Sequence, residues 1–148
     1  MGTRVKNKII PDSNHIARYC KPTTVENDEI LATAFLMRPI DESLSVNWLE
    51  YFKLNNREEE ISKIQKLYGG KFRNISPNAR IVVINVGEAR NKVLLESEDG
   101  RNLKFKHDRS IGDPSHSGIY NLNPDNEMIA ELILSVVDQE HHVYPAKK

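Results

Sequence analysis

The stretch "HIARYC" brings four chemically capable side chains within six positions, those of His15, Arg18, Tyr19 and Cys20. An arginine can hold a phosphate or carboxylate through paired hydrogen bonds, and a histidine can carry a proton near neutral pH. On a helix, His15 and Arg18 share a face with Tyr19, whereas on a strand Arg18 faces away from the other two. Because lone polar residues are more often structural, the alternative is that His15 and Arg18 lie on the surface while Cys20 packs in the core.

A second candidate is the loop "DPSHSGIY", residues 113–120, which holds Asp113, Ser115 and His116. Asp113 and Ser115 suit a turn around Pro114, because Asp and Ser side chains accept hydrogen bonds from nearby backbone N–H groups. The turn does not account for His116, which on an exposed loop can act as a general acid or base, with Asp113 orienting its imidazole. The alternative is a histidine that is hydrogen-bonded within the turn.

A third candidate is "SLSVNWLE", where polar and apolar residues interleave. On a strand, Ser45 and Asn47 lie on one face, and Trp48 follows them. An indole that stacks on a ligand, together with a hydroxyl and an amide that orient it, can form the wall of a pocket. The alternative is a half-exposed strand with Trp48 in the core.

No metal ion or cofactor is expected, because the histidines and Cys20 lack the spacing of metal ligands and Gly69-Gly70 follows a helix pattern instead of opening one. Cys20 and His116 have the residue types of a nucleophile and its base. No local signature supports that pairing.

Four blocks, "HIARYC", "AFLMR", "LSVNWLE" and "DPSHSGIY", follow one another and span most of residues 15–120. In these blocks the chain resembles an uncharacterised group of small bacterial proteins with the patterns HxxRYC, AFxxR, LSVNWLE and DPSHxGI. No activity comes with the resemblance. It implies that the four polar blocks belong to one site.

The composition is that of a globular protein of one domain, with 148 residues, 28% charged and 39% hydrophobic. Lys and Arg total 21, as do Asp and Glu, and this balance argues against a dedicated nonspecific nucleic-acid binder but not against a local basic patch. The single cysteine allows no internal disulfide. Because no signal peptide or membrane span is visible, we expect a cytoplasmic protein without membrane association.

The hydrophobic pattern predicts the α+β class, with a small mixed or antiparallel sheet in a single globular domain over residues 11–148 and a flexible segment over residues 1–10. Two main helices are expected. One covers about residues 56–68, after a cap at Asn55 or Asn56 and before Gly69-Gly70. The other covers about residues 124–139, after a cap at Asn123.

The strand signals are apolar runs and alternating patterns. Residues 79–86 predict a strand buried on both faces, and residues 30–38 a buried strand that ends at Pro39. Residues 44–52 predict a strand that gives way to a helical turn near Asn47. Residues 92–108 predict a hairpin with Asp99-Gly100 as its turn.

Two functions fit these observations. The first is a small accessory module that binds a partner protein, which the small size, the neutral charge and the lack of a specific catalytic signature favour. The second is a metal-independent enzyme that acts on a nucleotide, a dinucleotide or RNA.

In the enzyme hypothesis, Arg18 holds the anion, and His15 and His116 act as acid and base. Asp113 orients one of the two imidazoles. The remaining substrate-binding residues are Tyr19, Ser45, Asn47, Trp48 and Ser115. Convergence of His15, Arg18 and His116 in one pocket would favour the enzyme, whereas scatter together with a large apolar patch would favour the module.

Overall fold

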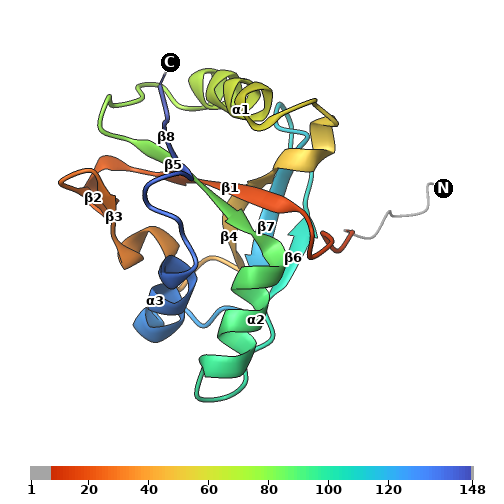
Figure 1. Cartoon of the computed structure of the whole chain (residues 1–148), viewed down its shortest axis with the longest axis vertical. Helices are drawn as coiled ribbons and strands as arrows, with labels where there is room; N and C mark the ends of the chain where they lie inside the picture. Colours follow the sequence, from red (N-terminus) through yellow and green to blue (C-terminus); the bar gives the residue numbers. More distant parts are fainter. Residues whose placement is uncertain (1–7, 148) are drawn as a thin grey trace.

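An antiparallel sheet forms the centre of the computed structural model, which describes residues 8–147 (Figure 1). In this part of the chain the sheet has six strands in the order β6-β7-β4-β1-β5-β8, and every pairing is antiparallel. The strands are β1 (His15–Cys20), β4 (Ser43–Trp48), β5 (Arg80–Asn85), β6 (Lys104–His107), β7 (His116–Tyr120) and β8 (Val143–Pro145). The predicted α+β class and antiparallel sheet are confirmed.

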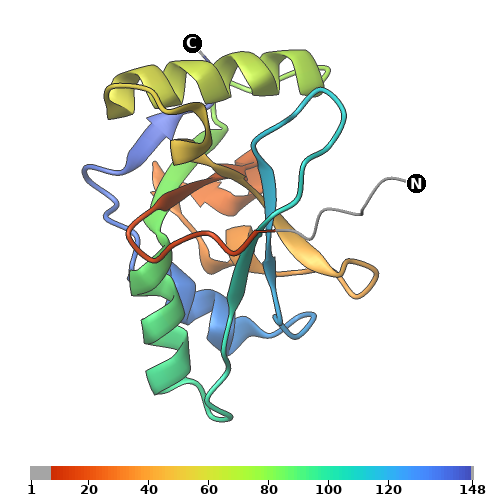
Figure 2. The ribbon, with the colours of Figure 1, turned by 90° about the vertical axis from the view of Figure 1, so that its right-hand side faces the viewer.

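Helices cover both faces of the sheet. Helix α1 (Arg57–Lys71) lies across one face, which we call the α1 face, and α2 (Val86–Glu96) and α3 (Glu127–Ser135) lie on the other (Figure 2). Successive residues of a strand point to opposite faces, so Ala17 packs into the core under α1 while Ile16 packs into the core under α2 and α3. Strand β5 is buried on both faces, as its β-branched run predicts.

Strands β1 and β4 separate part of the way along the sheet. Strand β1 pairs with β5 over its whole length, from His15 to Cys20. It pairs with β4 only at Ile16 and Ala17, while β4 continues alongside β7 as far as Ser43. A fork therefore opens between β1 and β4 beyond Ala17.

Helix α1 begins as predicted but ends later. The side chain of Asn56 caps it by accepting a hydrogen bond of 2.9 Å from the Glu59 N–H. The helix continues through Gly69-Gly70 to Lys71, and the N–H of Phe72 bonds to the Tyr68 carbonyl at 2.8 Å. Each glycine costs a helix about 1 kcal/mol relative to alanine. Just beyond the helix end, the Phe72 ring packs against Tyr19 of the sheet.

Helix α3 is shorter than the predicted 124–139. Its cap is Asn126, whose side chain accepts from the Ile129 N–H at 3.0 Å, and not Asn123. The preceding residue, Asp125, has a φ of 55° and forms part of a turn that delays the helix start.

The predicted hairpin over residues 92–108 is wrong. Helix α2 occupies its first residues, up to Glu96, and β6 pairs with β7 instead. Asn85 caps α2 by accepting from the Glu88 N–H at 2.9 Å, and Ala89 and Val93 are buried on one side of the helix. Gly100, with a φ of 60°, does form a turn, but this turn leads from the helix into β6.

The predicted strand over residues 30–38 is also wrong. The short strands β2 (Val25–Glu26) and β3 (Glu29–Ile30) pair with each other, and the 3₁₀ helix η2 (Ala32–Phe35) follows. A short apolar run cannot be assigned to strand or helix by periodicity alone. Residues 44–52 are as predicted, with β4 followed by the 3₁₀ helix η3 (Leu49–Phe52). A further 3₁₀ helix, η1 (Pro22–Thr24), follows β1.

The segment that precedes β1 contacts the edge strand β6. The N–H of Ile10 bonds to the Phe105 carbonyl and the N–H of His107 to the Lys8 carbonyl, both at 2.8 Å. The predicted flexible segment, residues 1–10, otherwise lies outside the described residues, and residues 8–10 are held by β6. None of the helices in the described range is long and apolar enough to cross a membrane.

Candidate functional site

A cleft of about 470 Å³ lies in the fork between β1 and β4, with the end of α1 above it and the segment around η2 beside it. This volume falls in the range of small-molecule sites in proteins, about 300–1,000 Å³. Four residues of the predicted substrate-binding set line the cleft, namely Arg18, Tyr19, Ser45 and Asn47. Residues from "HIARYC" and "SLSVNWLE" therefore meet in one place.

The Arg18 side chain bridges the two separated strands. Its Nε donates to the Ala34 carbonyl at 2.9 Å, and its Nη1 donates to the Ser45 carbonyl at 2.8 Å. Burial lowers the pKa of this guanidinium, which still stays charged because arginine pKa values start above 12. Within residues 8–147 the second terminal nitrogen, Nη2, has no hydrogen-bond partner. The cleft thus contains a fixed cation with a free donor.

The lining of the cleft is cationic. Among the described residues it includes the side chains of Arg18, Lys21, Arg38 and Lys71 against a single carboxylate, that of Asp41. Arg38 pairs with Asp41 through two hydrogen bonds of 2.8 and 3.0 Å, and these bonds hold the pKa of Asp41 below its ordinary value. A concave surface with an excess of one charge concentrates ligands of the opposite charge, so this cleft attracts anions.

Aromatic rings form one wall of the cleft. The Tyr19 ring stacks on Phe72 with centroids 4.5 Å apart and meets the Tyr68 ring edge-on at 5.3 Å. Burial raises the pKa of Tyr68 far above its ordinary value of 10, so its hydroxyl stays protonated and donates to Asn47 Oδ1 at 2.9 Å. This wall offers a surface on which a flat ring can stack.

A buried polar network holds the loop of residues 113–115 against β4. The Asn47 side-chain amide donates to Asp113 Oδ1 at 2.8 Å and to Ser115 Oγ at 2.9 Å, and Lys71 Nζ lies 3.3 Å from Asp113 Oδ2. Asp113 and Ser115 are thus structural contacts of Asn47, and Ser115 is fully buried. The Asp113 carboxylate makes no hydrogen bond with the His116 ring, contrary to the predicted orienting role.

His116 is oriented by a backbone carbonyl instead. Its Nδ1 lies 2.8 Å from the Asp108 carbonyl oxygen, which can only accept, so Nδ1 carries the proton. In the neutral ring Nε2 is then the acceptor, and Ser45 Oγ donates to it at 3.2 Å. His116 therefore lies beside the cleft and contacts one of its lining residues.

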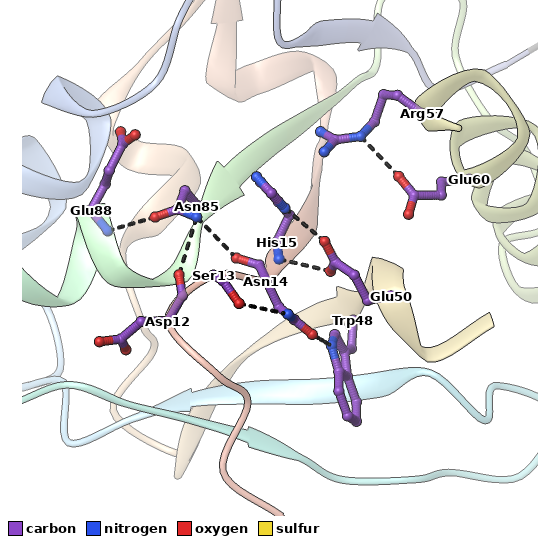
Figure 3. Close-up of polar contacts among 10 residues, drawn as sticks. All are labelled: Asp12, Ser13, Asn14, His15, Trp48, Glu50, Arg57, Glu60, Asn85 and Glu88. Carbon is purple, nitrogen blue, oxygen red and sulfur yellow. Dashed lines mark hydrogen bonds and ion pairs between the residues drawn. The ribbon is translucent and has the colours of Figure 1, made fainter. Parts of the chain in front are cut away.

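His15 lies at the other end of β1. Its backbone N–H and its Nδ1 contact the two carboxylate oxygens of Glu50, at 2.8 and 2.7 Å (Figure 3). Burial acts to raise the pKa of Glu50, but the hydrogen bonds from His15 outweigh it and hold that pKa below its ordinary value. His15 contacts neither Arg18 nor His116, so the three predicted residues do not converge. The His15–Glu50 pair joins β1 to η3.

Trp48 also lies outside the cleft. It faces away from Ser45 and Asn47, because neighbouring strand residues alternate. Its Nε1 donates to Asn14 Oδ1 at 2.9 Å (Figure 3), and its ring lies 5.4 Å from that of His107. The Trp48 side chain thus packs near the start of β1.

The Cys20 thiol is buried, and burial raises its pKa to about 12. It is therefore a poor nucleophile at neutral pH. In the part of the chain that the structure describes, no group of three or more His, Cys, Asp or Glu side chains is placed to hold a metal ion.

Several lining residues were missed at the level of sequence. Lys71 and Phe72 follow Gly69-Gly70, where the sequence pattern ends the helix, and Tyr68 is the last residue of the predicted helix over residues 56–68, where it gives no chemical signal. Lys21 directly follows "HIARYC" and Arg38 ends the "AFLMR" block, but neither is among the predicted site residues. No known protein family matches the chain, and no curated protein or solved structure is significantly similar to it.

Proposed function

We propose that the protein is a metal-independent enzyme that binds a phosphate-containing substrate of the nucleotide class in the cleft between β1 and β4. The observation that carries the proposal is the position of Arg18. Its guanidinium is fixed by two carbonyls in the floor of a cationic cleft and keeps Nη2 for a ligand. A donor that is already fixed loses little conformational entropy when it binds a phosphate oxygen.

The aromatic wall supports a nucleotide over a simple phosphate. Tyr19 and Phe72 already stack on each other, and both line the cleft. Stacking of a base on an aromatic side chain is worth about 1–3 kcal/mol. A volume of about 470 Å³ leaves room for a base and a sugar beside the phosphate.

His116 is the acid–base group of this proposal. Its Nε2 is an acceptor beside the cleft, and its ring is fixed through Nδ1. His15, which is bound to Glu50, has no part in it.

The partner-binding module is the competing function. The large exposed hydrophobic side chains in the described chain, such as Ile40, Leu95 and Ile111, come from separate segments of the sequence. This function becomes the better explanation if the cleft binds no nucleotide.

The test is calorimetric titration and thermal unfolding of the full chain with AMP, ATP, NAD⁺ and a short single-stranded RNA. At one hundred times its dissociation constant, a ligand adds about 2.7 kcal/mol of stability, which raises Tm by several degrees. Arg18→Gln is expected to weaken binding by tenfold or more, because it removes a charge-assisted hydrogen bond.

Two variants complete the design. Lys21→Ala removes an exposed lining cation and is expected to weaken binding severalfold without affecting the fold. Arg90→Gln breaks an ion pair with Asp12 outside the cleft and is expected to leave affinity unchanged. Binding of none of the four probes, or equal weakening by Arg90→Gln and Arg18→Gln, contradicts the proposal.

A further inference from the structure

We infer that Ser45 is a nucleophile that His116 activates, so that the cleft transfers a phosphoryl group from a phosphate ester onto Ser45 Oγ. The inference rests on the proposed function, since the phosphate-binding cleft must bring the ester to Ser45. It adds a covalent intermediate and assigns the residue that carries it.

The first support is the direction of the hydrogen bonds around His116. The Asp108 carbonyl fixes the proton on Nδ1, which leaves the Nε2 lone pair directed at the Ser45 hydroxyl at 3.2 Å. This is the arrangement of an activated serine, in which a base lies within hydrogen-bond reach and a further group orients that base. When Nε2 becomes protonated, the Asp108 carbonyl still accepts the hydrogen bond from Nδ1–H.

The second support is the location of Ser45. It is solvent-exposed and lines the cleft, while its own carbonyl accepts from Arg18 Nη1 at 2.8 Å. The Arg18 guanidinium is therefore bound to the same residue that carries the hydroxyl. A cation fixed there can stabilise the charge on the phosphoryl oxygens as the bond to Oγ forms.

The third support is the contrast with Ser43, which lines the same cleft from the same face of β4. Ser43 lies opposite Tyr120 and packs against Gly118, where an added Cβ would come within 2.6 Å of Ser43 Oγ. Ser43 has no contact with His116 among the described residues. Of the two serines, Ser45 is the one placed for activation.

The phosphoryl transfer to Ser45 requires neither a metal ion nor an oxidant. Ser45 Oγ attacks phosphorus, and the Oγ–P bond forms as the P–O bond to the leaving alcohol breaks. The hydroxyl proton moves to His116 Nε2 and then to the departing oxygen. A water molecule, deprotonated by His116, next attacks the phosphoserine, which restores the Ser45 hydroxyl and releases phosphate.

Labelling of the full chain with diisopropyl fluorophosphate, followed by intact mass and peptide mapping, tests the inference. In this reaction Oγ bonds to phosphorus and fluoride leaves. We expect a single adduct on Ser45. It is absent in Ser45→Ala, unchanged in Ser43→Ala and formed about a hundredfold more slowly in His116→Asn, which loses the base.

Failure of the inference is distinguishable from failure of the proposed function. Each variant is also titrated with the nucleotide that binds the wild type, and its unfolding midpoint is measured. No adduct on Ser45, or equal rates in the wild type and a folded His116→Asn, overturns the nucleophile even where nucleotide binding is retained. A wild type that forms the Ser45 adduct but binds no nucleotide supports the nucleophile and overturns the proposed function.

Discussion

The two ends of β1 hold their polar side chains in different ways. At the His15 end, β1 has a strand on each side, and His15 is bound at both its N–H and Nδ1 by Glu50. At the Arg18 end, β4 has moved away, and a guanidinium takes the place of strand pairing by donating to two carbonyls. Where pairing stops, backbone and side-chain groups become accessible to a ligand. The same strand thus has a structural histidine and a candidate binding arginine only three residues apart.

The largest expected effect is that of Asn47→Ala, at the floor of the cleft. The change leaves the buried Asp113 carboxylate without one hydrogen bond and the Tyr68 hydroxyl without its acceptor. Each such loss costs about 1–3 kcal/mol, so the free energy of unfolding should fall by about 2–6 kcal/mol. Urea unfolding followed by circular dichroism measures it.

The control is Asn91→Ala, on the exposed side of α2, which should change stability by less than about 0.5 kcal/mol. If Asn47→Ala and Asn91→Ala lowered the free energy of unfolding equally, the polar network around Asn47 would not hold the loop of residues 113–115.

A smaller effect is expected for Gly118→Ala, on the strand beside Ser45. The new Cβ would lie 2.6 Å from Ser43 Oγ and 2.9 Å from the Tyr120 ring, so β4 and β7 must shift. Overpacking of this kind costs about 1–3 kcal/mol, which appears as a lower urea midpoint.

Gly69→Ala is the matched glycine change. Position 69 lies in a helix with no atom within 4 Å of an added Cβ. Alanine there should stabilise the protein by about 0.5–1 kcal/mol, because it favours the helix. A stabilising Gly118→Ala would show that the sheet around Ser45 is looser than its contacts indicate.

The smallest expected effect belongs to the His15 end. Glu50→Gln keeps a hydrogen-bond acceptor but removes the charge that His15 contacts, so stability at neutral pH should fall by about 1 kcal/mol. The pKa of Glu50 in the folded state lies below its ordinary 4.5, so its contribution is complete above that pH and is lost as the pH falls further. The difference between the two proteins should therefore shrink in acid.

Unfolding of both proteins at pH 7 and at pH 3 measures this difference. Glu98→Gln, on an exposed side chain, should show no such pH dependence. A gap between wild type and Glu50→Gln that widened in acid would contradict the pairing with His15.

Local sequence patterns predict which residues share a face of a strand. Contacts between distant parts of the sequence determine which strands meet and where the helices end. Ser45 and Asn47 lie together because strand side chains alternate, which the sequence reveals directly. The meeting of Arg18 with Ser45 depends on where β1 leaves β4, and that register is set by contacts far apart in the sequence. Helix α1 likewise continues past two glycines and is followed by Phe72, whose stacking on Tyr19 is a contact that local propensity does not include.

The same reasoning explains the misassigned hairpin. Asp99-Gly100 does make a turn. Val86, Ala89 and Val93, however, are buried on one side of α2, and this burial favours a helix over the strand that the turn suggested. The enzyme hypothesis groups His15 with Arg18 by residue type and by a shared helix face, but this segment is a strand, on which the two side chains face opposite ways. The contact of His15 with Glu50 joins residues 35 positions apart, which no spacing rule identifies.

The contact of residues 8–10 with β6 has a consequence for how the protein behaves at high concentration. Strand β6 is an edge strand of the sheet. The free backbone N–H and C=O groups of an edge strand can pair with a strand of another molecule. The backbone groups of Lys8 and Ile10 form hydrogen bonds with part of that edge. Residues 8–10 thereby reduce the part of β6 that is open to intermolecular β-pairing, and we expect their removal to increase aggregation.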